Sequence, residues 1–267
     1  MSTALVSCLM VTKGTPERLP GLTTAISCFA QQTHAPLELV IVVDSKDPGA
    51  HDRVTTLVAA MHAAGVRTIR GDDGMSLGAL RNLSMRLSHG SFWCQWDDDD
   101  LHHPRRVAAQ LAGLAAEDAG GVLLQDVLQY YPATQQLWWT NWHATQTRGH
   151  PGTLLCRRDC GISYPESGQD AQRGEDTVVA CQLIARGALT TLGDQPFLYV
   201  YVSHGLNTYD SAHHQMLSAR LGVSRGRISR HESQLRRELA AFGTLLSGVG
   251  VVAPNAELPV FRIPTSA

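Results

Sequence analysis

The chain has 267 residues, a mass of 28.9 kDa and a formal net charge of −2, with 43% apolar and 17% charged residues. This length allows one large α/β domain, or a domain with a short appendage, to bury a core without disulfides. A net charge this close to zero provides no basic field, so neither nucleic acid nor an anionic membrane is expected as a partner.

Cysteine usage and the distribution of apolar residues bear on location. None of the six cysteines forms a C-x-x-C pair, and several stand in apolar runs, as reduced and buried cysteines do in cytosolic proteins. The first apolar stretch ends at Lys13 and lacks the basic flank of a signal peptide. No run of eighteen apolar residues suggests a transmembrane helix. We therefore expect a cytoplasmic protein, associated at most with the periphery of the inner membrane.

Short apolar runs alternate with amphipathic stretches over the first half of the chain. Runs rich in Val, Leu and Ile predict buried strands, and a start such as Thr15-Pro16 predicts a helix. In chain order we expect a strand at 4–11, a helix at 15–29, a strand at 37–43, a helix at 50–63, a strand at 66–70, a helix at 76–87, a strand at 91–96 and a helix at 104–116. This alternation predicts an α/β fold with a mostly parallel central sheet and helices on both faces.

The pattern after residue 120 is looser. It predicts a hairpin from 122–131 and 136–140, strands at 152–156, 188–192 and 197–202, a helix at 175–185 and an amphipathic helix at 229–246. Three late prolines predict an extended tail. We expect one domain over 1–205, with halves at about 1–118 and 119–205, followed by a C-terminal helical extension and extended tail over 206–267.

Four consecutive aspartates, Asp97 to Asp100, follow the predicted strand at 91–96. Their repulsion would raise their pKa values unless a cation or hydrogen-bond donors offset it. Alternate side chains leave a strand in one direction, so Asp97 and Asp99 would face the same side. Such a pair suits Mg²⁺ or Mn²⁺, which binds carboxylates together with substrate phosphates. A solvated acidic loop is the alternative, and Asp100 would cap the helix that Pro104 begins.

Six segments in chain order resemble those of the family 2 glycosyltransferases, which have the Rossmann-like GT-A fold. The resemblance covers roughly residues 4–210. Its segments are the opening strand 6–13, the strand 39–45, the helix start 78–82, the D-x-D run 96–100, the Glu-Asp pair in 174–176 and the closing segment 199–208. Each motif alone occurs by chance in many proteins, but six in order indicate the family.

The resemblance implies an inverting enzyme that moves a sugar from a nucleoside diphosphate-sugar, with UDP favoured, to a hydroxyl acceptor. That acceptor would be a saccharide, a lipid-linked molecule or a small molecule. Thr12 and Asp44 would hold the base, although a turn would also explain Asp44. Arg81 would meet the nucleotide or an acidic wall, or form an ion pair on a helix surface. Asp97 would contact the ribose or the metal, and Asp98 the nucleotide or the backbone. The halves 1–118 and 119–205 would serve donor and acceptor.

The metal and catalytic residues are also implied by the resemblance. Asp99, with Asp97 and His204, would hold the Mn²⁺ or Mg²⁺ that neutralises the leaving diphosphate. Asp176 would be the general base, and the like charge of Glu175 would raise its pKa. A structural histidine at 204 and a helix-dipole role for the Glu-Asp pair are the alternatives.

Three tryptophans, Trp138, Trp139 and Trp142, stand within five residues. Sugars stack on aromatic faces, so they would form an acceptor or donor platform. Core packing or a dimer contact would use the same side chains. Residues 206–267 carry no segment of the family and would form an acceptor cover or the interface of a homodimer.

One residue departs from the family pattern, and two other functions are compatible with parts of the sequence. Lys13 stands where the family commonly has a small polar residue, which bears on the base contacts. A sugar-phosphate nucleotidyltransferase would need a glycine-rich, basic phosphate loop, whereas residues 13–18 contain a single glycine. A non-catalytic sugar-binding module would not require both the acidic run and Asp176.

Overall fold

The computed structural model describes residues 4–265, so residues 1–3 and 266–267, at the outer ends of the two expected domains, lie outside the described residues. Its larger sheet has seven strands in the order β10-β6-β9-β4-β1-β2-β3. Their bounds are β1 (Val6–Thr12), β2 (Leu37–Val43), β3 (Val66–Arg70), β4 (Phe92–Gln95), β6 (Gly121–Leu124), β9 (His150–Arg157) and β10 (Leu189–Leu192). All neighbours are parallel except β9, which runs antiparallel to β4 and β6. The predicted mostly parallel sheet is confirmed.

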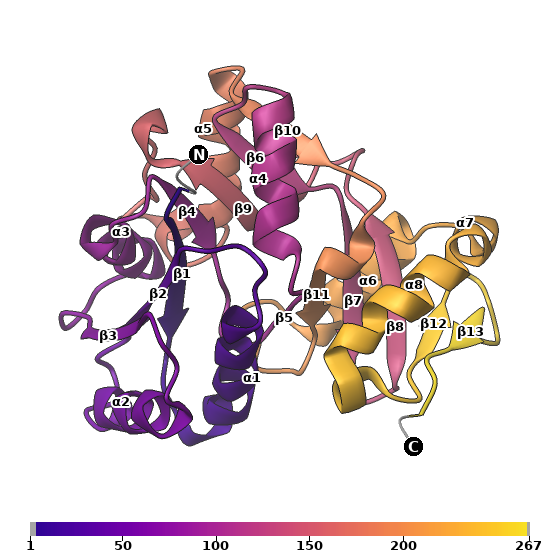
Figure 1. Cartoon of the computed structure of the whole chain (residues 1–267), viewed down its shortest axis with the longest axis horizontal. Helices are drawn as coiled ribbons and strands as arrows, with labels where there is room; N and C mark the ends of the chain where they lie inside the picture. The colour runs from indigo at the N-terminus through magenta and orange to yellow at the C-terminus, as the bar shows by residue number, and fades with distance from the viewer. Residues whose placement is uncertain (1–3, 266–267) are drawn as a thin grey trace.

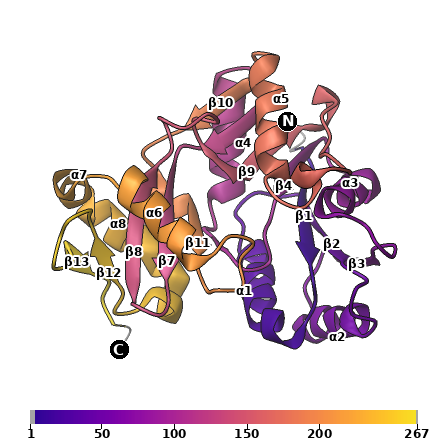
Figure 2. The ribbon, with the colours of Figure 1, turned by 180° about the vertical axis from the view of Figure 1, so that it is seen from behind.

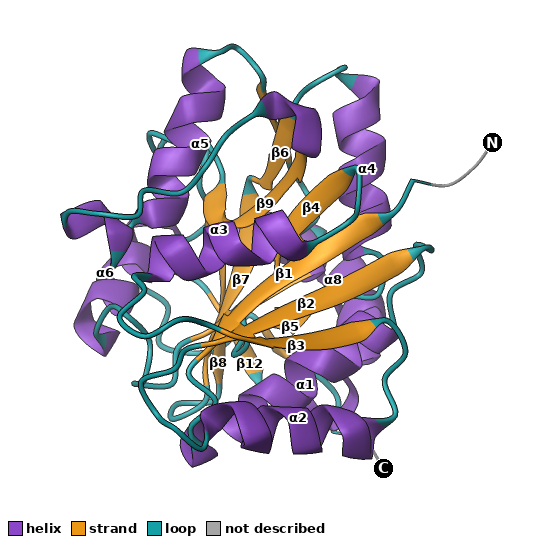
Figure 3. Ribbon diagram, turned by 90° about the vertical axis from the view of Figure 1, so that its left-hand side faces the viewer, coloured by secondary structure: helices purple, strands orange, loops and turns teal. Residues whose placement is uncertain are grey.

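Helices cover both faces of this sheet (Figure 3). They are α1 (Leu19–Ala30), α2 (Ala50–Met61), α3 (Leu77–Leu87), α4 (Arg106–Ala116) and α5 (Glu175–Ala185). Because strand side chains alternate, β1 turns Cys8 and Met10 to the core under α1, α2 and α4, and Leu9 to the core under α3 and α5. The arrangement of one sheet between two layers of helices follows from strands that are apolar on both faces.

A second sheet stands beside the first, with six strands in the order β13-β12-β8-β7-β11-β5 (Figure 1). Their bounds are β5 (Leu101–His102), β7 (Asp126–Tyr131), β8 (Gln136–Asn141), β11 (Tyr199–Val202), β12 (Gly250–Val252) and β13 (Phe261–Arg262). The predicted hairpin is β7–β8, paired from Asp126 with Asn141 to Tyr131 with Gln136, whereas residues 121–124 belong to the larger sheet. Helix α6 (Ser211–Leu221) lies on one side of this sheet and α8 (Glu232–Leu239) on the other (Figures 1 and 2).

The last sixty residues differ from the expectation in detail. The single helix predicted at 229–246 is divided into α7 (Arg225–Arg230), α8 and a 3₁₀ segment, η5 (Ala240–Leu246), in which Gly243 has a positive φ of 53°. The predicted extended tail contains β12, which pairs with β8 in parallel, and β13. Val251, Phe261 and Leu235 share one core with Leu128 and Trp139 of the second sheet. The expected domain boundary at residue 205 stays a prediction.

The acidic run connects the two sheets, because residues 97–100 lead directly from β4 into β5. Its aspartates thus stand at the carboxyl end of a central parallel strand and at the edge of the second sheet. Ligands bind at such carboxyl ends in open α/β sheets. Within residues 4–265, no helix has the length and apolar character that a bilayer span requires.

Candidate functional site

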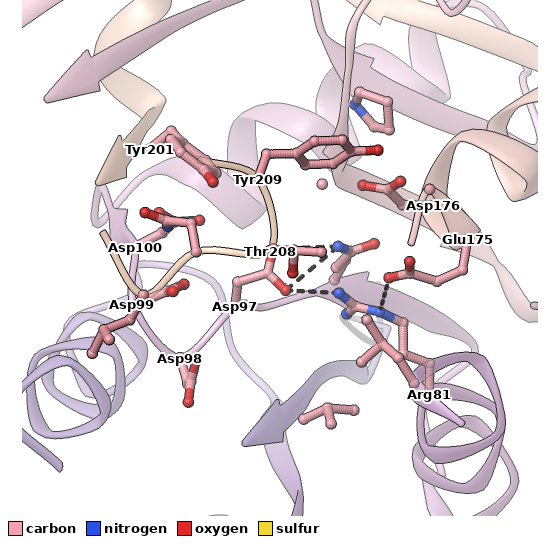
Figure 4. Close-up of a pocket in the computed structure, with 18 of the residues that line it drawn as sticks. Arg81, Asp97, Asp98, Asp99, Asp100, Glu175, Asp176, Tyr201, Thr208 and Tyr209 are labelled. Atoms are coloured by element: carbon pink, nitrogen blue, oxygen red, sulfur yellow. Dashed lines mark hydrogen bonds and ion pairs between the residues drawn. The ribbon is translucent and has the colours of Figure 1, made fainter. Parts of the chain in front are cut away.

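A cleft of about 690 Å³ opens between the two sheets (Figure 4). All of the predicted donor and catalytic residues line it, and so does Asp99, whereas His204 does not: the lining includes Thr12, Asp44, Arg81, Asp97, Asp98, Asp99, Glu175 and Asp176. They come from the ends of β1, β2 and β4, from α3 and from the start of α5. Residues far apart in the sequence are therefore brought to one wall by the parallel strand order.

Arg81 bridges two carboxylates of the cleft. Its Nε donates to Glu175 at 2.8 Å, and its terminal nitrogen donates to Asp97 at 3.1 Å. Arg81 is only 9% exposed, so it meets the acidic wall and not a partner on a helix surface. The pair of contacts fixes the start of α5 against the end of β4, and it orients Asp97 by a charge-assisted bond.

Asp98 is held inside the protein. Thr12 donates its hydroxyl to Asp98 at 2.5 Å, and Arg18 donates to the other carboxylate oxygen at 3.0 Å. Burial and the neighbouring Asp99 raise the pKa of Asp98 to about 7, while Arg18 and Thr12 oppose that rise. The Thr12 hydroxyl, predicted to hold the base, is thus engaged with the acidic run.

Asp99 faces the second sheet. Its Oδ2 accepts from Arg18 at 2.7 Å and from Nε2 of His204 at 2.9 Å. Burial acts to raise the pKa of Asp99, but the bond from His204 and the charge of Arg18 outweigh it and lower the pKa. The backbone N–H of Leu206 donates to Nδ1 of His204 at 3.2 Å, so the hydrogen-bond pattern assigns the proton to Nε2.

Asp100 does not cap a helix, which corrects the sequence expectation. It accepts from the hydroxyl of Tyr199 and from the backbone N–H of Val202, the latter at 2.8 Å. Helix α4 begins after Arg105 with no side-chain cap. Burial, followed by the charges of Asp99 and Asp97, raises the pKa of Asp100 well above its usual range. Asp100 therefore joins the acidic run to β11.

The donors available to a divalent cation are fewer than the sequence suggests. No group of three or more His, Cys, Asp or Glu side chains converges on a common point among residues 4–265. Asp97 faces Arg81, while the Oδ2 of Asp99 and the Nε2 of His204 approach each other at 2.9 Å. Mg²⁺ and similar ions need only one or two protein ligands when substrate phosphates supply the rest. Asp99 and His204 are the two side chains that would meet this requirement, although Oδ2 of Asp99 here accepts from Arg18 and from Nε2 of His204.

The Glu-Asp pair begins α5, directly after Gly174 with its positive φ of 82°. Both side chains line the cleft, but Glu175 is buried and engaged by Arg81, whereas Asp176, within residues 4–265, accepts only from the backbone N–H and the hydroxyl of its neighbour Thr177, the former at 2.7 Å. Burial, with a further contribution from Glu175 and opposition from Arg81, raises the pKa of Asp176 to about 7. A carboxylate with this pKa can accept a proton near neutral pH.

The effect of the Glu175 charge on the pKa of Asp176 should appear in the pH dependence of kcat/KM. If Asp176 is the base, kcat/KM falls as pH drops below about 7, because the carboxylate becomes protonated. Glu175→Gln removes a like charge, lowers the pKa of Asp176 and moves this acidic limb to lower pH. The measurement is kcat/KM against pH, with Glu117→Gln on the exposed end of α4 as control. An unchanged midpoint in Glu175→Gln would contradict the coupling.

Asp44 and two lysines form the other end of the cleft. Asp44 follows β2, is 8% exposed, and accepts from the backbone N–H of Lys46 at 3.2 Å. The ammonium of Lys46 lies 3.4 Å from the same carboxylate. The turn considered for Asp44 therefore exists, and Asp44 lines the cleft as well. Lys13 lines this end too, with an exposed side chain.

The tryptophan platform is reduced to one residue. Trp142 lines the cleft, where its ring stands edge-on to His150 with centroids 4.7 Å apart. Trp139 is 1% exposed and donates to the buried Asp126 at 2.7 Å. Trp138 is half-buried on β8 and does not line the cleft. Trp138 and Trp139 are consecutive on one strand, so their side chains point to opposite faces.

Three residues of the cleft, Arg18, Tyr201 and Tyr209, were not predicted from the sequence. Arg18 reaches the acidic run from 80 residues away. Tyr201 belongs to the closing segment and Tyr209 directly follows it; Figure 4 shows both above the acidic run, with Tyr209 beside Asp176. The guanidinium of Arg173 lies 3.9 Å from the ring centroid of Tyr209. Only the position of Arg18 in a polar loop after the first strand could have drawn attention to it.

The sequence of residues 7–167 matches the model of the family described as Glycosyl transferase family 2. The structure is similar to S. aureus TarS 1–349, with a TM-score of 0.56 and 15% identity over 88% of this chain and 74% of that chain. The same fragment in complex with UDP-GlcNAc gives a TM-score of 0.58 and 14% identity over 88% of this chain and 66% of that chain.

A third solved structure is the mannosyltransferase PcManGT from Pyrobaculum calidifontis in complex with GDP-Man and Mn²⁺. It gives a TM-score of 0.58 and 14% identity over 92% of this chain and 69% of that chain. At these identities the likeness establishes the fold. No curated protein matches the sequence. Because the family match spans more than half of the chain and the neighbours share its architecture, this protein belongs to the family 2 glycosyltransferases and is an enzyme with the GT-A fold.

Proposed function

We propose that the protein is an inverting, divalent-metal-dependent glycosyltransferase that moves a sugar from a nucleoside diphosphate-sugar to an acceptor hydroxyl. The observation that carries this proposal is that Asp176, with a pKa of about 7, lines the same cleft as the acidic run. Two neighbours of similar fold support it, since one is in complex with UDP-GlcNAc and the other with GDP-Man and Mn²⁺.

The donor would lie along the ends of β1, β2 and β4. Its base would lie near Asp44 and Lys13, and UDP is the donor nucleotide that we favour. Its diphosphate would lie beside Asp99 and His204, which would hold Mn²⁺ or Mg²⁺ together with phosphate oxygens. When bound, the cation neutralises the charge that develops on the leaving diphosphate. Asp97, oriented by Arg81 at 3.1 Å, would contact the ribose.

The acceptor would approach from the second sheet. Trp142, Tyr201 and Tyr209 line that side of the cleft, and aromatic faces of this kind bind saccharides or the apolar part of other acceptors. Asp176 would remove the proton from the acceptor hydroxyl as its oxygen attacks the anomeric carbon opposite the diphosphate. Glu175 is engaged by Arg81 at 2.8 Å, which leaves Asp176 as the carboxylate available for this proton. A single in-line displacement inverts the anomeric centre.

The rival functions have less support. A nucleotidyltransferase needs backbone N–H groups of a glycine-rich loop around its phosphates. Here the segment after β1 has one glycine, Gly14, which packs against Ala50 and Val54.

We further propose a cytoplasmic location, which the six free cysteines support.

A thermal-shift panel of UDP, GDP, CDP and the corresponding triphosphates, each with and without Mn²⁺, tests the donor site. Ligands stabilise only the state that binds them, by about 2.7 kcal/mol at 100 times Kd. We expect a metal-dependent rise in melting temperature, largest for UDP. A panel in which no diphosphate stabilises the protein in the presence of Mn²⁺ would contradict the proposed function. Stabilisation by nucleoside triphosphates in preference to diphosphates would favour the nucleotidyltransferase.

A further inference from the structure

Arg18 is the feature of the cleft that the proposed mechanism does not use. It ends the 3₁₀ turn η1 (Pro16–Arg18), and its side chain is 13% exposed. One terminal nitrogen donates to Asp98 at 3.0 Å and to Asp99 at 2.7 Å. The other donates to the carbonyl oxygen of Leu206 at 2.7 Å. A single guanidinium thus joins the acidic run to the closing segment.

The position of this guanidinium conflicts with a cation on the same carboxylate. Oδ2 of Asp99 accepts from Arg18 on one side and from His204 on the other. A divalent ion held between Asp99 and His204 would replace the bond from Nε2 of His204 to Oδ2 of Asp99, the same oxygen that accepts from Arg18. Two cations near one carboxylate also repel each other, at an energy that is large in a partly buried site. Arg18 and the metal therefore compete for Asp99.

The closing segment is linked to the competition between Arg18 and the metal ion for Asp99. Leu206 accepts from Arg18 through its carbonyl and donates to Nδ1 of His204 through its N–H. While that bond persists, His204 keeps its proton on Nε2 and donates to Asp99. A metal ligand must instead present a lone pair at Nε2. If Arg18 no longer bonded the carbonyl oxygen of Leu206, the N–H of Leu206 could leave Nδ1 of His204. The proton of His204 could then move from Nε2 to Nδ1.

A donor diphosphate offers Arg18 a new partner. The guanidinium is a planar fork whose donors match phosphate oxygens, and such charge-assisted bonds are about twice as strong as neutral ones. Arg18 lines the cleft beside Asp99, where the proposed function has the diphosphate. The diphosphate would arrive with the metal, so Arg18 would exchange its ion pair with the Asp99 carboxylate for an ion pair with a phosphate group.

We propose that Arg18 is the internal counter-cation of the acidic run in the free enzyme and becomes a ligand of the donor diphosphate when donor and metal bind. This inference rests on the proposed donor site in the same cleft. It predicts effects of opposite sign on two affinities. Removal of Arg18 should strengthen binding of the metal alone and weaken binding of the diphosphate in the presence of metal. A purely structural role would not produce this opposition.

The test uses the full chain and calorimetric titration with two probes, Mn²⁺ alone and UDP in saturating Mn²⁺. For Arg18→Ala we expect about tenfold tighter Mn²⁺ binding and at least about tenfold weaker UDP binding, the size of one charge-assisted contact. Arg18→Lys keeps the charge without the fork and should give smaller changes of the same signs. Arg53→Ala is the matched control, since Arg53 pairs with Asp47 outside the cleft.

The outcomes separate this inference from the function on which it rests. If the wild-type protein binds neither UDP nor GDP in Mn²⁺, the proposed donor site is contradicted, and the role of Arg18 with it. If the wild type binds but both affinities are unchanged or both fall in folded Arg18→Ala and Arg18→Lys, the inference alone is overturned. Circular dichroism establishes that each variant is folded.

Discussion

Asp176→Asn is expected to lower the rate of sugar transfer by about 100-fold to 10,000-fold, the usual contribution of a positioned general base. Asn has the shape of Asp but cannot accept the proton of the acceptor hydroxyl. Because Asp176 lies away from Asp99 in the cleft, Mn²⁺-dependent binding of the nucleoside diphosphate should persist (Figure 4). Initial rates of diphosphate release in the presence of acceptor measure the first effect, and calorimetry the second.

Asp170→Asn is the control for this experiment. Asp170 is exposed in the short 3₁₀ turn that precedes α5, and it does not line the cleft. Its substitution should leave the transfer rate unchanged. Transfer by Asp176→Asn at the wild-type rate would remove Asp176 from the mechanism. If the protein binds sugar and Asp176→Asn changes no measurable activity, a non-catalytic sugar-binding module would be favoured.

Asp99→Ala is expected to abolish transfer and to weaken Mn²⁺-dependent binding of the diphosphate by at least about 100-fold, since a bound cation supplies several kcal/mol of charge stabilisation. The loss should be larger than for any single neighbour in the run, because Asp99 alone of the four contacts His204. Calorimetric titration of UDP with and without Mn²⁺ measures it. Asp52→Ala, whose side chain is 92% exposed on α2, is the control.

Unchanged Mn²⁺-dependent binding in Asp99→Ala would contradict the metal assignment. The variant also removes one partner of Arg18, which would remain paired with Asp98 at 3.0 Å and with the carbonyl oxygen of Leu206. Any binding of UDP that no longer responds to Mn²⁺ would therefore reflect Arg18 and other protein donors. The comparison of Asp99→Ala with and without metal separates these two contributions.

Local patterns in the sequence predicted the parts of the fold on which the donor site depends. Apolar runs such as 37–43 predict buried parallel strands because both faces of such a strand are covered. The acidic run follows one of these strands, so its place at the edge of the sheet could be anticipated. Asp176 was expected at the start of a helix, and α5 begins one residue before it.

Contacts between distant segments could not be anticipated. Arg18 meets Asp98 and Asp99 only after β1 and β4 have paired, and no periodicity encodes that meeting. Strand alternation separates Trp138 from Trp139 but does not say which face of β8 is covered. Strands as short as β12 and β13, of three and two residues, lie below the length at which a pattern is readable. The tail therefore looked extended.

We propose that Asp176 and a metal-bound diphosphate act on opposite sides of the anomeric carbon. Proton NMR of the product tests it most directly, with the nucleotide-sugar whose diphosphate stabilises the protein most and an acceptor that it glycosylates. We expect transfer only with Mn²⁺ or Mg²⁺, and a newly formed glycosidic bond whose anomeric configuration is opposite to that of the donor. A product that retains the donor's configuration, or equal transfer in the presence of a metal chelator, would contradict it.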